Sequence, residues 1–378
     1  MRRPSTTWYA VALLVASTVG IGFYGIPYTF AKAGTGIGVF FLLGVTALVL
    51  ISNLLYGEVV LRTHERHQFV GYVNAYLGPW ARLVNLFTFW VSLWGAIVGI
   101  MLLSGKFISE VMSYAGAQIN PKIIGVLVLA IVTTFVFRGL KMIAHMDFVV
   151  MILASLIVGM IIVFGTPHMV SGNFAFASKT AWFLPFGVIL FSLNGVQGVP
   201  LVREVLIGKE HWYRRALVIG TLIPALLYLV FTMVVVGVTG PMTSPEAIPG
   251  LAGILGGGVI ILGSLFGALT SGTILLSILT SFRESLKEDF HLRRRWHMMA
   301  LLLPPLLLFL FGGLNFVRVI SLVGGIAVSI DMILLIMIYA QAKQKGTRIP
   351  EYTLSLPKII LYSMMVLFAL GALYTVVS

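Results

Sequence analysis

The sequence predicts an all-α membrane protein that crosses the bilayer about eleven times, and three observations lead to this prediction. Of the 378 residues, 59% are hydrophobic and only 10% are charged, and the mean hydropathy is +1.04. Soluble domains carry about 25% charged residues, so this chain lacks the polar side chains to cover a surface in water. Apolar runs long enough to span a bilayer as helices recur throughout, and basic residues gather in alternate loops between them.

Each apolar run of about 17 or more residues is expected to form one helical span. The expected spans are 8–33, 37–61, 83–112, 122–138, 142–166, 182–205, 214–239, 251–282, 297–313, 316–340 and 357–377. The fourth is the shortest, and it depends on Lys122 and Arg138 reaching the two interfaces from its ends. The chain has no cysteine, which excludes disulfides and thiolate metal sites.

The basic residues predict the orientation of the spans. Of the 25 Lys and Arg residues, 20 fall in one set of alternate loops and 5 on the other side. Loops rich in Lys and Arg stay in the cytoplasm, so the amino terminus is expected inside and the carboxy terminus outside a plasma (inner) membrane. The net charge of +13 is thus read as a topology signal, and no nucleic-acid partner is expected.

A short motif that occurs twice in the chain predicts two repeats of opposite orientation. Gly25-Ile26-Pro27 recurs as Gly198-Val199-Pro200, 173 residues later, in register with the pattern of spans. We therefore expect a single transmembrane transport domain, 1–378, with repeats at about 8–166 and 182–340 and an extra helix at about 357–377. Five spans per repeat is an odd number, so the second repeat is inverted. Inverted repeats with Gly/Pro-interrupted spans are typical of transporters whose binding site lies at the breaks, although ordinary kinked helices would carry the same residues.

The first break also contains a G-x-G-x-x-G spacing, Gly20 to Gly25, of the kind that binds dinucleotides. That interpretation requires a preceding strand and an acidic residue about 20 positions later, and neither is present. Within a membrane span, a break frees backbone amides at the start of the outer half-helix, where a partial positive charge favours an anion. A carboxylate is therefore the expected ligand of these glycines.

The sequence resembles a known family at several points. The stretch "VASTVGIGFYGIPYTFAKAG" resembles the first span of the amino acid–polyamine–organocation superfamily, and "FLPFGVILFSLNGVQGVPLVREVL" is similar to the sixth span of its amino acid/auxin permease branch. The stretches "LFGALTSGTILLSILTSFRESLKEDF" and "LLLPPLLLFLFGGLNFVRVISLVGGI" most resemble bacterial hydroxy/aromatic amino acid (tryptophan/tyrosine) permeases. The resemblance implies a leucine-transporter-like fold with broken helices 1 and 6. Phe23 and Tyr24 make the first break bulkier than is usual in that branch.

In this context, the two breaks are predicted to bind an amino acid. Amides of the first break would hold its carboxylate, and carbonyls of both breaks would accept from its ammonium group. The predicted substrate-binding residues are Thr18, Gly20, Ile21, Gly22, Phe23, Ser192, Leu193, Asn194 and Gly195. The Asn194 side chain would equally serve as an ordinary hydrogen bond between helices. Neither break has a charged side chain, which favours a neutral, aromatic or large apolar substrate.

The sequence leaves the coupling ion open between a proton and sodium. Thr270 and Ser271 match a hydroxyl pair that ligates sodium in sodium-coupled relatives, with the carbonyls of Ala16 and Val19 completing the site. Hydroxyl groups in membrane helices more often bond to their own backbone. The most similar permeases are thought to use protons, and Asp331 lies deeper in its span than the other intramembrane acids, which makes it the proton-coupling candidate.

Other functional classes are weighed against this one. An embedded enzyme would need clustered His, Asp or Glu within the spans. The histidines lie mostly in the loops and no such cluster is apparent in the spans, so no enzyme, metal site or cofactor is expected. A metal-ion transporter of the same fold would need acidic and amide ligands in the first break and a methionine in the sixth span. The sequence has neither, so this class is disfavoured. A ligand-sensing subunit that does not transport would keep the same pocket, and it is the alternative. The expected partners are a small amino acid and the lipid bilayer.

Overall fold

The protein is described from a computed structural model that places residues 6–137, 146–175, 181–289 and 294–377. The placed residues are almost all helical and contain no β-strand. Among these residues, six helical segments could cross a membrane by length and composition, and the bent pair of the first span makes a seventh. Three shorter apolar helices and the interrupted sixth span bring the total to the eleven expected spans.

The long apolar spans contain α3 (Thr35–Arg62), α5 (Pro79–Tyr114), α10 (Tyr213–Thr239), α12 (Gly257–Asp289), α15 (Ser329–Lys345) and α16 (Lys358–Val377). The shorter apolar helices are α6 (Pro121–Phe137), α7 (Met146–Gly165) and α13 (Arg294–Phe311). The two interrupted spans consist of α1 (Thr6–Thr18) with α2 (Ile26–Ala33), and α8 (Leu184–Ser192) with α9 (Gly198–Val205). The tenth span begins with α14 (Phe316–Leu322) and the π-helical segment η8 (Val323–Val328), which α15 continues.

Short helices occupy the connections. They are α4 (Phe69–Leu77), α11 (Ala252–Leu255) and the 3-10 turns η3 (Thr166–His168), η4 (Ser171–Phe174), η5 (Glu210–Trp212), η6 (Gly240–Met242) and η7 (Pro249–Leu251). The sequence pattern gave no sign of α4, whose nine residues lie in the expected loop 62–82. Tyr72 and Val73 of α4 are buried, so this helix belongs to the packed part of the molecule.

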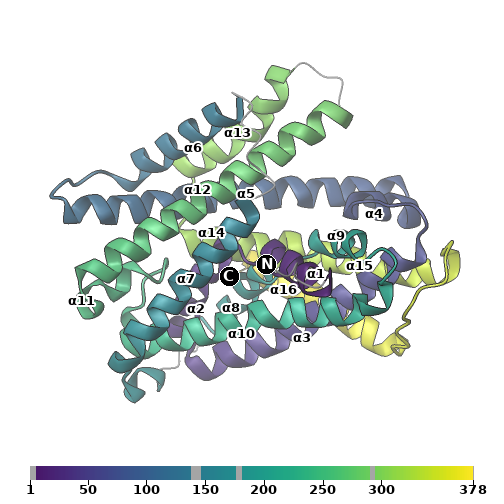
Figure 1. Ribbon diagram of the computed structural model, residues 1–378, viewed down its shortest axis with the longest axis horizontal. Coiled ribbons are helices and arrows are strands. Elements are labelled where there is room, and N and C mark those ends of the chain that lie inside the picture. Colours follow the sequence, from purple (N-terminus) through teal and green to yellow (C-terminus); the bar gives the residue numbers. More distant parts are fainter. Residues whose placement is uncertain (1–5, 138–145, 176–180, 290–293, 378) are drawn as a thin grey trace.

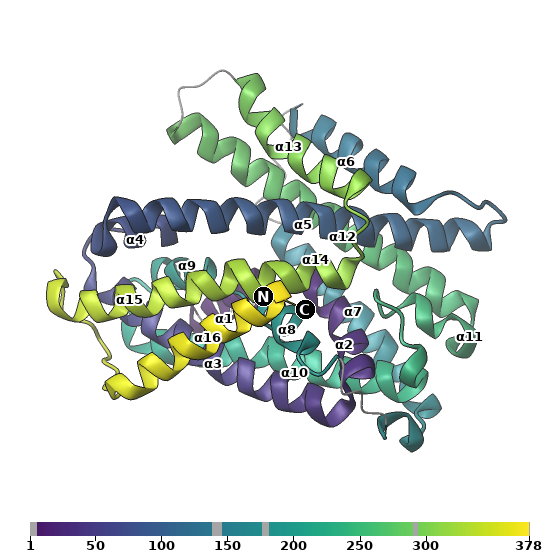
Figure 2. The same cartoon turned by 180° about the vertical axis from the view of Figure 1, so that it is seen from behind.

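The spans form two groups around the interrupted helices. Figures 1 and 2 both show α6, α12 and α13 gathered on one side and α3 and α10 on the opposite side. Between them, α1 packs against α9 and α10, whereas α8 packs against α2, α3 and η8. The two broken spans thus lie in the interior, where protein rather than lipid meets their freed backbone.

Two glycines let α8 approach the π-helical segment closely. A Cβ atom at Gly324 would overlap the carbonyl oxygen of Gly187, and a Cβ at Gly187 would overlap the carbonyl of Ser321. Small residues at such crossings let helix backbones come into contact in membrane proteins. The sixth span is therefore held against the tenth span along its first half.

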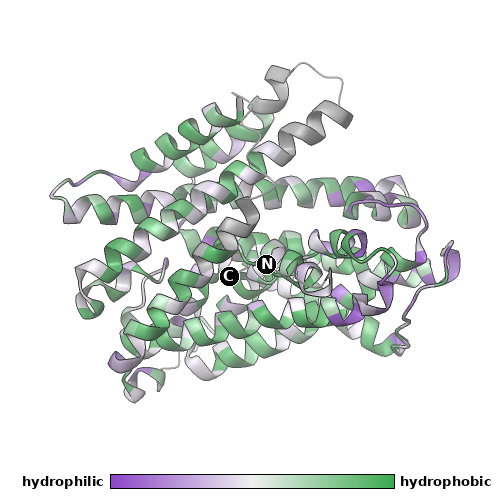
Figure 3. Cartoon of the chain, viewed as in Figure 1, coloured by the Kyte–Doolittle hydropathy of each residue, from purple (hydrophilic) through white to green (hydrophobic). Residues whose placement is uncertain are grey.

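Several polar loops meet at one end of the molecule. Hydrophilic residues gather there in Figure 3, near α4, α9 and the far end of α15. Arg203 of α9 donates to the carbonyls of Val60 and Thr63 at 2.5 and 2.9 Å, and the backbone N–H of His64 donates to Thr347 at 3.0 Å. The basic loops after α3, α9 and α15 consequently share one face, as the charge pattern requires. Arg138 and Lys141 lie outside the described residues.

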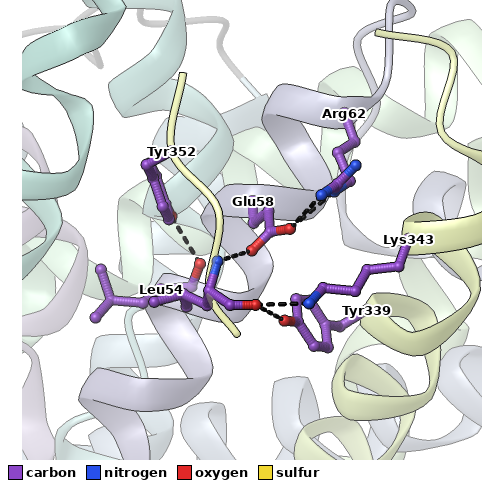
Figure 4. Close-up of polar contacts among 7 residues, drawn as sticks. Leu54, Glu58, Arg62, Tyr339, Lys343 and Tyr352 are labelled. Atoms are coloured by element: carbon purple, nitrogen blue, oxygen red, sulfur yellow. Dashed lines mark hydrogen bonds and ion pairs between the residues drawn. The ribbon is translucent and has the colours of Figure 1, made fainter. Parts of the chain in front are cut away.

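The segment 346–357, which joins α15 to α16, crosses the polar end of α3 (Figure 4). The buried carboxylate of Glu58 pairs with Arg62 at 2.7 Å and accepts the backbone N–H of Leu354 at 2.6 Å. Tyr352 donates to a carbonyl of α3 at 2.6 Å, and burial raises its pKa well above the ordinary range, so the phenol stays a donor. The segment is therefore fastened to α3 by both side-chain and main-chain hydrogen bonds.

Candidate functional site

The first break separates α1 from α2 by a turn of irregular backbone. The last helical bond of α1 runs from Val19 N to Val15 O at 2.8 Å, which leaves the Thr18 carbonyl beyond the regular helix. Gly20 is extended (φ −129°, ψ −153°), and the 3-10 turn η1 (Ile21–Gly25) leads into α2. The two halves of the span are bent by 53°. The predicted interruption is confirmed.

The second break has the same construction at the end of α8. The last helical bond runs from Leu193 N to Ile189 O at 2.9 Å, so the Ser192 carbonyl also lies beyond the regular helix. Residues 193–197 are not α-helical, and α9 resumes at Gly198. Leu193 is buried and Asn194 is half-buried.

The two breaks face each other reciprocally. A Cβ at Gly22 would lie 2.5 Å from Ser192 Oγ and 2.9 Å from Ser192 Cα, and a Cβ at Gly195 would overlap Thr18 Oγ1. Thr18 and Ser192 each end their helix in the same way, because each hydroxyl donates to the carbonyl four residues earlier, at 2.8 and 2.7 Å. A glycine of each break therefore packs against the last hydroxyl residue of the other.

These contacts place the predicted substrate residues together and refine the expected role of the glycines. All nine lie in two segments that touch across the interior, although they are far apart in sequence. The Cβ direction of Gly22 points at Ser192, so its missing side chain makes room for α8. Gly20 instead has no other described atom within 4 Å of its Cβ position. The open space at the first break thus lies at Gly20.

Tyr228 of α10 joins the two helix ends. Its single hydroxyl hydrogen is shared between two carbonyl oxygens, that of Thr18 at 3.3 Å and that of Ser192 at 3.2 Å from the phenol oxygen, and the whole residue is buried. Sequence reasoning did not single out Tyr228. It lies in an unbroken apolar helix, where one tyrosine among many hydrophobic residues gives no signal of its partners.

An aromatic layer covers one side of the first break. The ring of Phe23 stacks on Tyr24 at 4.1 Å and on Tyr228 at 5.8 Å, and it meets the edge of Phe231 at 5.2 Å. Phe107 of α5 packs against Tyr24 at 5.2 Å. All five side chains are fully buried. The large side chains of Phe23 and Tyr24, which are unusual in the first break, thus pack against aromatic residues of α5 and α10.

The predicted sodium ligands of α12 bond to their own helix. Thr270 Oγ1 donates to Phe266 O at 2.8 Å, and Ser271 Oγ donates to Gly267 O at 2.7 Å. Both residues are buried, and Thr270 lies beside the Tyr24 hydroxyl. Back-bonding of this kind satisfies a hydroxyl donor within the membrane and leaves its oxygen able to accept. The sodium site, with the carbonyls of Ala16 and Val19, stays a prediction.

Asp331 lies where α5 meets the first turn of α15. Its Oδ1 accepts from Asn85 Nδ2 at 2.8 Å and from Thr88 Oγ1 at 2.5 Å, and it forms no ion pair with a described residue. Glu58, an acid near the end of α3, is instead paired with Arg62. Asp331 thus differs from Glu58 in having only neutral partners within the described chain.

Two interrupted spans that meet at their breaks inside a helical bundle are characteristic of transporters with the leucine-transporter fold. The crystal structure of MhsT in complex with L-phenylalanine matches this architecture, with a TM-score of 0.67, 14% sequence identity and 97% of each chain covered. The chain belongs to the tryptophan/tyrosine permease family, whose sequence pattern matches residues 3–376. Tyrosine-specific transport system 2 of Haemophilus influenzae is 25% identical over 350 residues, covering 84% of this chain and 83% of that protein.

These findings confirm the fold class and the family that the sequence suggested. The protein is a multi-pass membrane protein and an amino acid transporter, and it is not an enzyme.

Proposed function

We propose that this protein imports a large neutral amino acid, aromatic for preference, by proton-coupled symport with alternating access. The observation that carries the proposal is the reciprocal meeting of the two breaks, where the carbonyls of Thr18 and Ser192 receive no bond from their own helices, accept only from Tyr228 among the described contacts, and lie beside the start of η1. An amino acid carries one negative and one positive group on adjacent atoms. The site offers amide donors for the first and carbonyl acceptors for the second.

The carboxylate is assigned to the first break. The opening N–H groups of a helical segment lack partners within the segment, and they carry the positive end of its dipole. The amides of Ile21 and Gly22 open η1. The open space beside Gly20 supports the approach of a ligand to this point.

The neutral side chain follows from what surrounds the breaks. Residues 19–25 and 193–197 contain no charged side chain, and the adjoining layer is formed by Phe23, Tyr24, Phe107 and Phe231. A charged substrate side chain would be left without a partner at this depth, which is costly. Similar proteins also support an aromatic substrate. One relative is named a tyrosine-specific transport system, and a structure of similar fold is a complex with L-phenylalanine.

The proton is assigned to Asp331. An acid that is held at membrane depth by neutral partners is costly when ionised, and binding a proton removes that charge. Asn85 and Thr88 contact one oxygen of Asp331, which leaves the second for the proton. Asp331 joins α15 to α5, so its protonation would act where two spans meet. Moving one positive charge down 100 mV is worth about 2.3 kcal/mol, or roughly a fifty-fold accumulation of substrate.

The orientation is assigned from the shared basic end. The loops after α3, α9 and α15 meet there, and positively charged loops stay in the cytoplasm. The proposed orientation has the amino terminus inside the cell and the carboxy terminus outside, in the plasma (inner) membrane. Cysteines introduced singly at Glu65 and at Ala117 test it, because only the second should react with an impermeant thiol reagent on intact cells.

The decisive experiment is uptake by purified protein in liposomes. Labelled L-tyrosine, L-tryptophan, L-phenylalanine, L-lysine and L-glutamate are supplied with a proton gradient or a sodium gradient alone. We expect the three aromatic amino acids to accumulate under the proton gradient and the two charged ones to stay out. Accumulation that requires sodium would refute the assignment of Asp331 and turn attention to Thr270 and Ser271. Saturable binding with no flux under any gradient would identify a sensor.

A further inference from the structure

The position of Tyr228 determines how the two breaks are spaced. Its hydroxyl is one atom from which hydrogen bonds run to Thr18 O at 3.3 Å and to Ser192 O at 3.2 Å. The two carbonyl oxygens therefore lie no farther apart than the sum of these lengths. Neither carbonyl accepts a hydrogen bond from a further turn of its own helix, so the Tyr228 hydroxyl is the described group that restrains both.

This upper limit on the separation of the two carbonyl oxygens is compatible with a bridging ammonium group. An N–H···O bond measures about 2.7–3.2 Å, and an ammonium nitrogen has three donors. A single nitrogen can thus bridge two carbonyl oxygens at the separation that one hydroxyl oxygen bridges. The Tyr228 oxygen can itself accept as well as donate, which adds a third acceptor beside the pair.

The surroundings hold Tyr228 in place. The residue is fully buried, and its ring lies nearly parallel to Phe23 at 5.8 Å, with 9° between the ring planes. The hydroxyl therefore reaches the helix ends from a fixed ring on α10, a span that is not broken. Because α10 packs against both α1 and α9, it is well placed to set one break relative to the other.

We propose that Tyr228 is a positioning residue that fixes the separation of the Thr18 and Ser192 carbonyls, and that it thereby gives the site its requirement for a primary α-ammonium group. This inference rests on the proposed function, and it adds a residue that acts through the carbonyls of both breaks. Without the hydroxyl, the two helix ends are free to drift, and the carbonyl pair no longer matches one nitrogen.

The test compares two buried tyrosines that differ in their hydrogen bonds. Tyr228→Phe removes the bridging hydroxyl and keeps the ring that stacks on Phe23. Tyr56→Phe is the matched control, since Tyr56 is fully buried in α3 and its hydroxyl has no hydrogen-bond partner among the described residues. Binding of L-tyrosine and of its deaminated analogue, 3-(4-hydroxyphenyl)propionate, is measured for each monodisperse protein.

We expect Tyr228→Phe to weaken L-tyrosine binding about tenfold or more, as the loss of such hydrogen bonds implies. Binding of the deaminated acid should change by less than twofold, because that ligand makes no bond to the carbonyls. Tyr56→Phe should leave both affinities unchanged. Equal weakening of both ligands in Tyr228→Phe would show a general structural role, and unchanged or tighter L-tyrosine binding would also overturn the proposal.

Wild-type protein provides a second measurement that does not depend on the folding of a variant. N,N,N-trimethyl-L-tyrosine keeps the positive charge and has no N–H donor, so the wild type should bind it at least a hundredfold more weakly than L-tyrosine. Comparable binding of the two ligands would refute the ammonium requirement even if Tyr228→Phe does not fold. If wild-type protein binds neither L-tyrosine nor any other amino acid, the proposed function fails, which is a separate outcome.

Discussion

Replacing Gly22 with alanine tests whether the close contact between the two breaks is needed for binding. The added Cβ would fall 2.5 Å from Ser192 Oγ, 2.9 Å from a ring carbon of Phe191 and 2.9 Å from Ser192 Cα. The Cα atom cannot rotate away, and the Ser192 hydroxyl is held by its 2.7 Å bond to Val188 O. The overlap is relieved only if η1 and α8 move apart.

The size of the effect follows from that overlap. Added methyl groups in a packed interior cost about 1–3 kcal/mol, and each 1.4 kcal/mol is a factor of ten in affinity. Relief of the strain separates the breaks, whereas the bound ligand needs them together, so relief competes with binding. We expect the dissociation constant for L-tyrosine to rise about five- to hundredfold.

Competition binding with labelled L-tyrosine on purified, monodisperse protein measures this change. Gly44→Ala is the matched control, since Gly44 lies in the unbroken α3 and no other described atom lies within 4 Å of its Cβ position. Its affinity should stay within twofold of the wild type. The reasoning fails if Gly22→Ala also binds within twofold of the wild type, or if Gly44→Ala loses as much.

Three further predictions concern coupling, the carboxylate and the polar end. Asp331→Asn should keep exchange of substrate across the membrane and lose accumulation under a proton gradient; accumulation at the wild-type level would rule out Asp331 as the coupling acid. L-Tyrosine amide should compete at least a hundredfold more weakly than L-tyrosine, because a neutral amide gains little from the start of a helix; equal competition would remove the carboxylate site. Glu58→Gln should lower stability by about 2 kcal/mol in thermal unfolding, since it removes the charge that pairs with Arg62 and leaves one oxygen acceptor for the donors of Arg62 and Leu354, whereas Glu351→Gln in a more exposed ion pair should change it by less than 1 kcal/mol; equal losses would contradict this.

The breaks could be located from sequence because their cause is local. Glycines and proline within an apolar run weaken the helix wherever they occur. Gly20, Gly25 and Pro27 therefore predict the first interruption from local sequence alone. The same holds for the second, where the repeat of the Gly-x-Pro pattern added support. Span number followed from composition and length, which also act locally.

The contacts between the breaks could not be located in this way. Tyr228 and Phe231 lie in a helix that is apolar on all sides, and periodicity does not reveal which face meets another broken span. The fastening of Glu58 to Leu354 joins residues almost 300 positions apart through a backbone N–H, and a main-chain donor leaves no mark on the sequence. Tertiary contacts of both kinds appear only when the spans are assembled.

The symmetry of the site explains why a single residue outside the breaks is needed to align them. Thr18 and Ser192 end their helices alike, and each packs against a glycine of the other break, so neither repeat by itself fixes the relative position of the two carbonyls. Tyr228 binds both carbonyls from α10, and at the 173-residue offset of the repeated Gly-x-Pro motif the corresponding position in the first repeat is Leu55, which has no side-chain hydroxyl. The relative position of the two helix ends thus depends on the Tyr228 hydroxyl, which has no counterpart in the first repeat. Any movement that separates α1 from α8 must break at least one of its two hydrogen bonds.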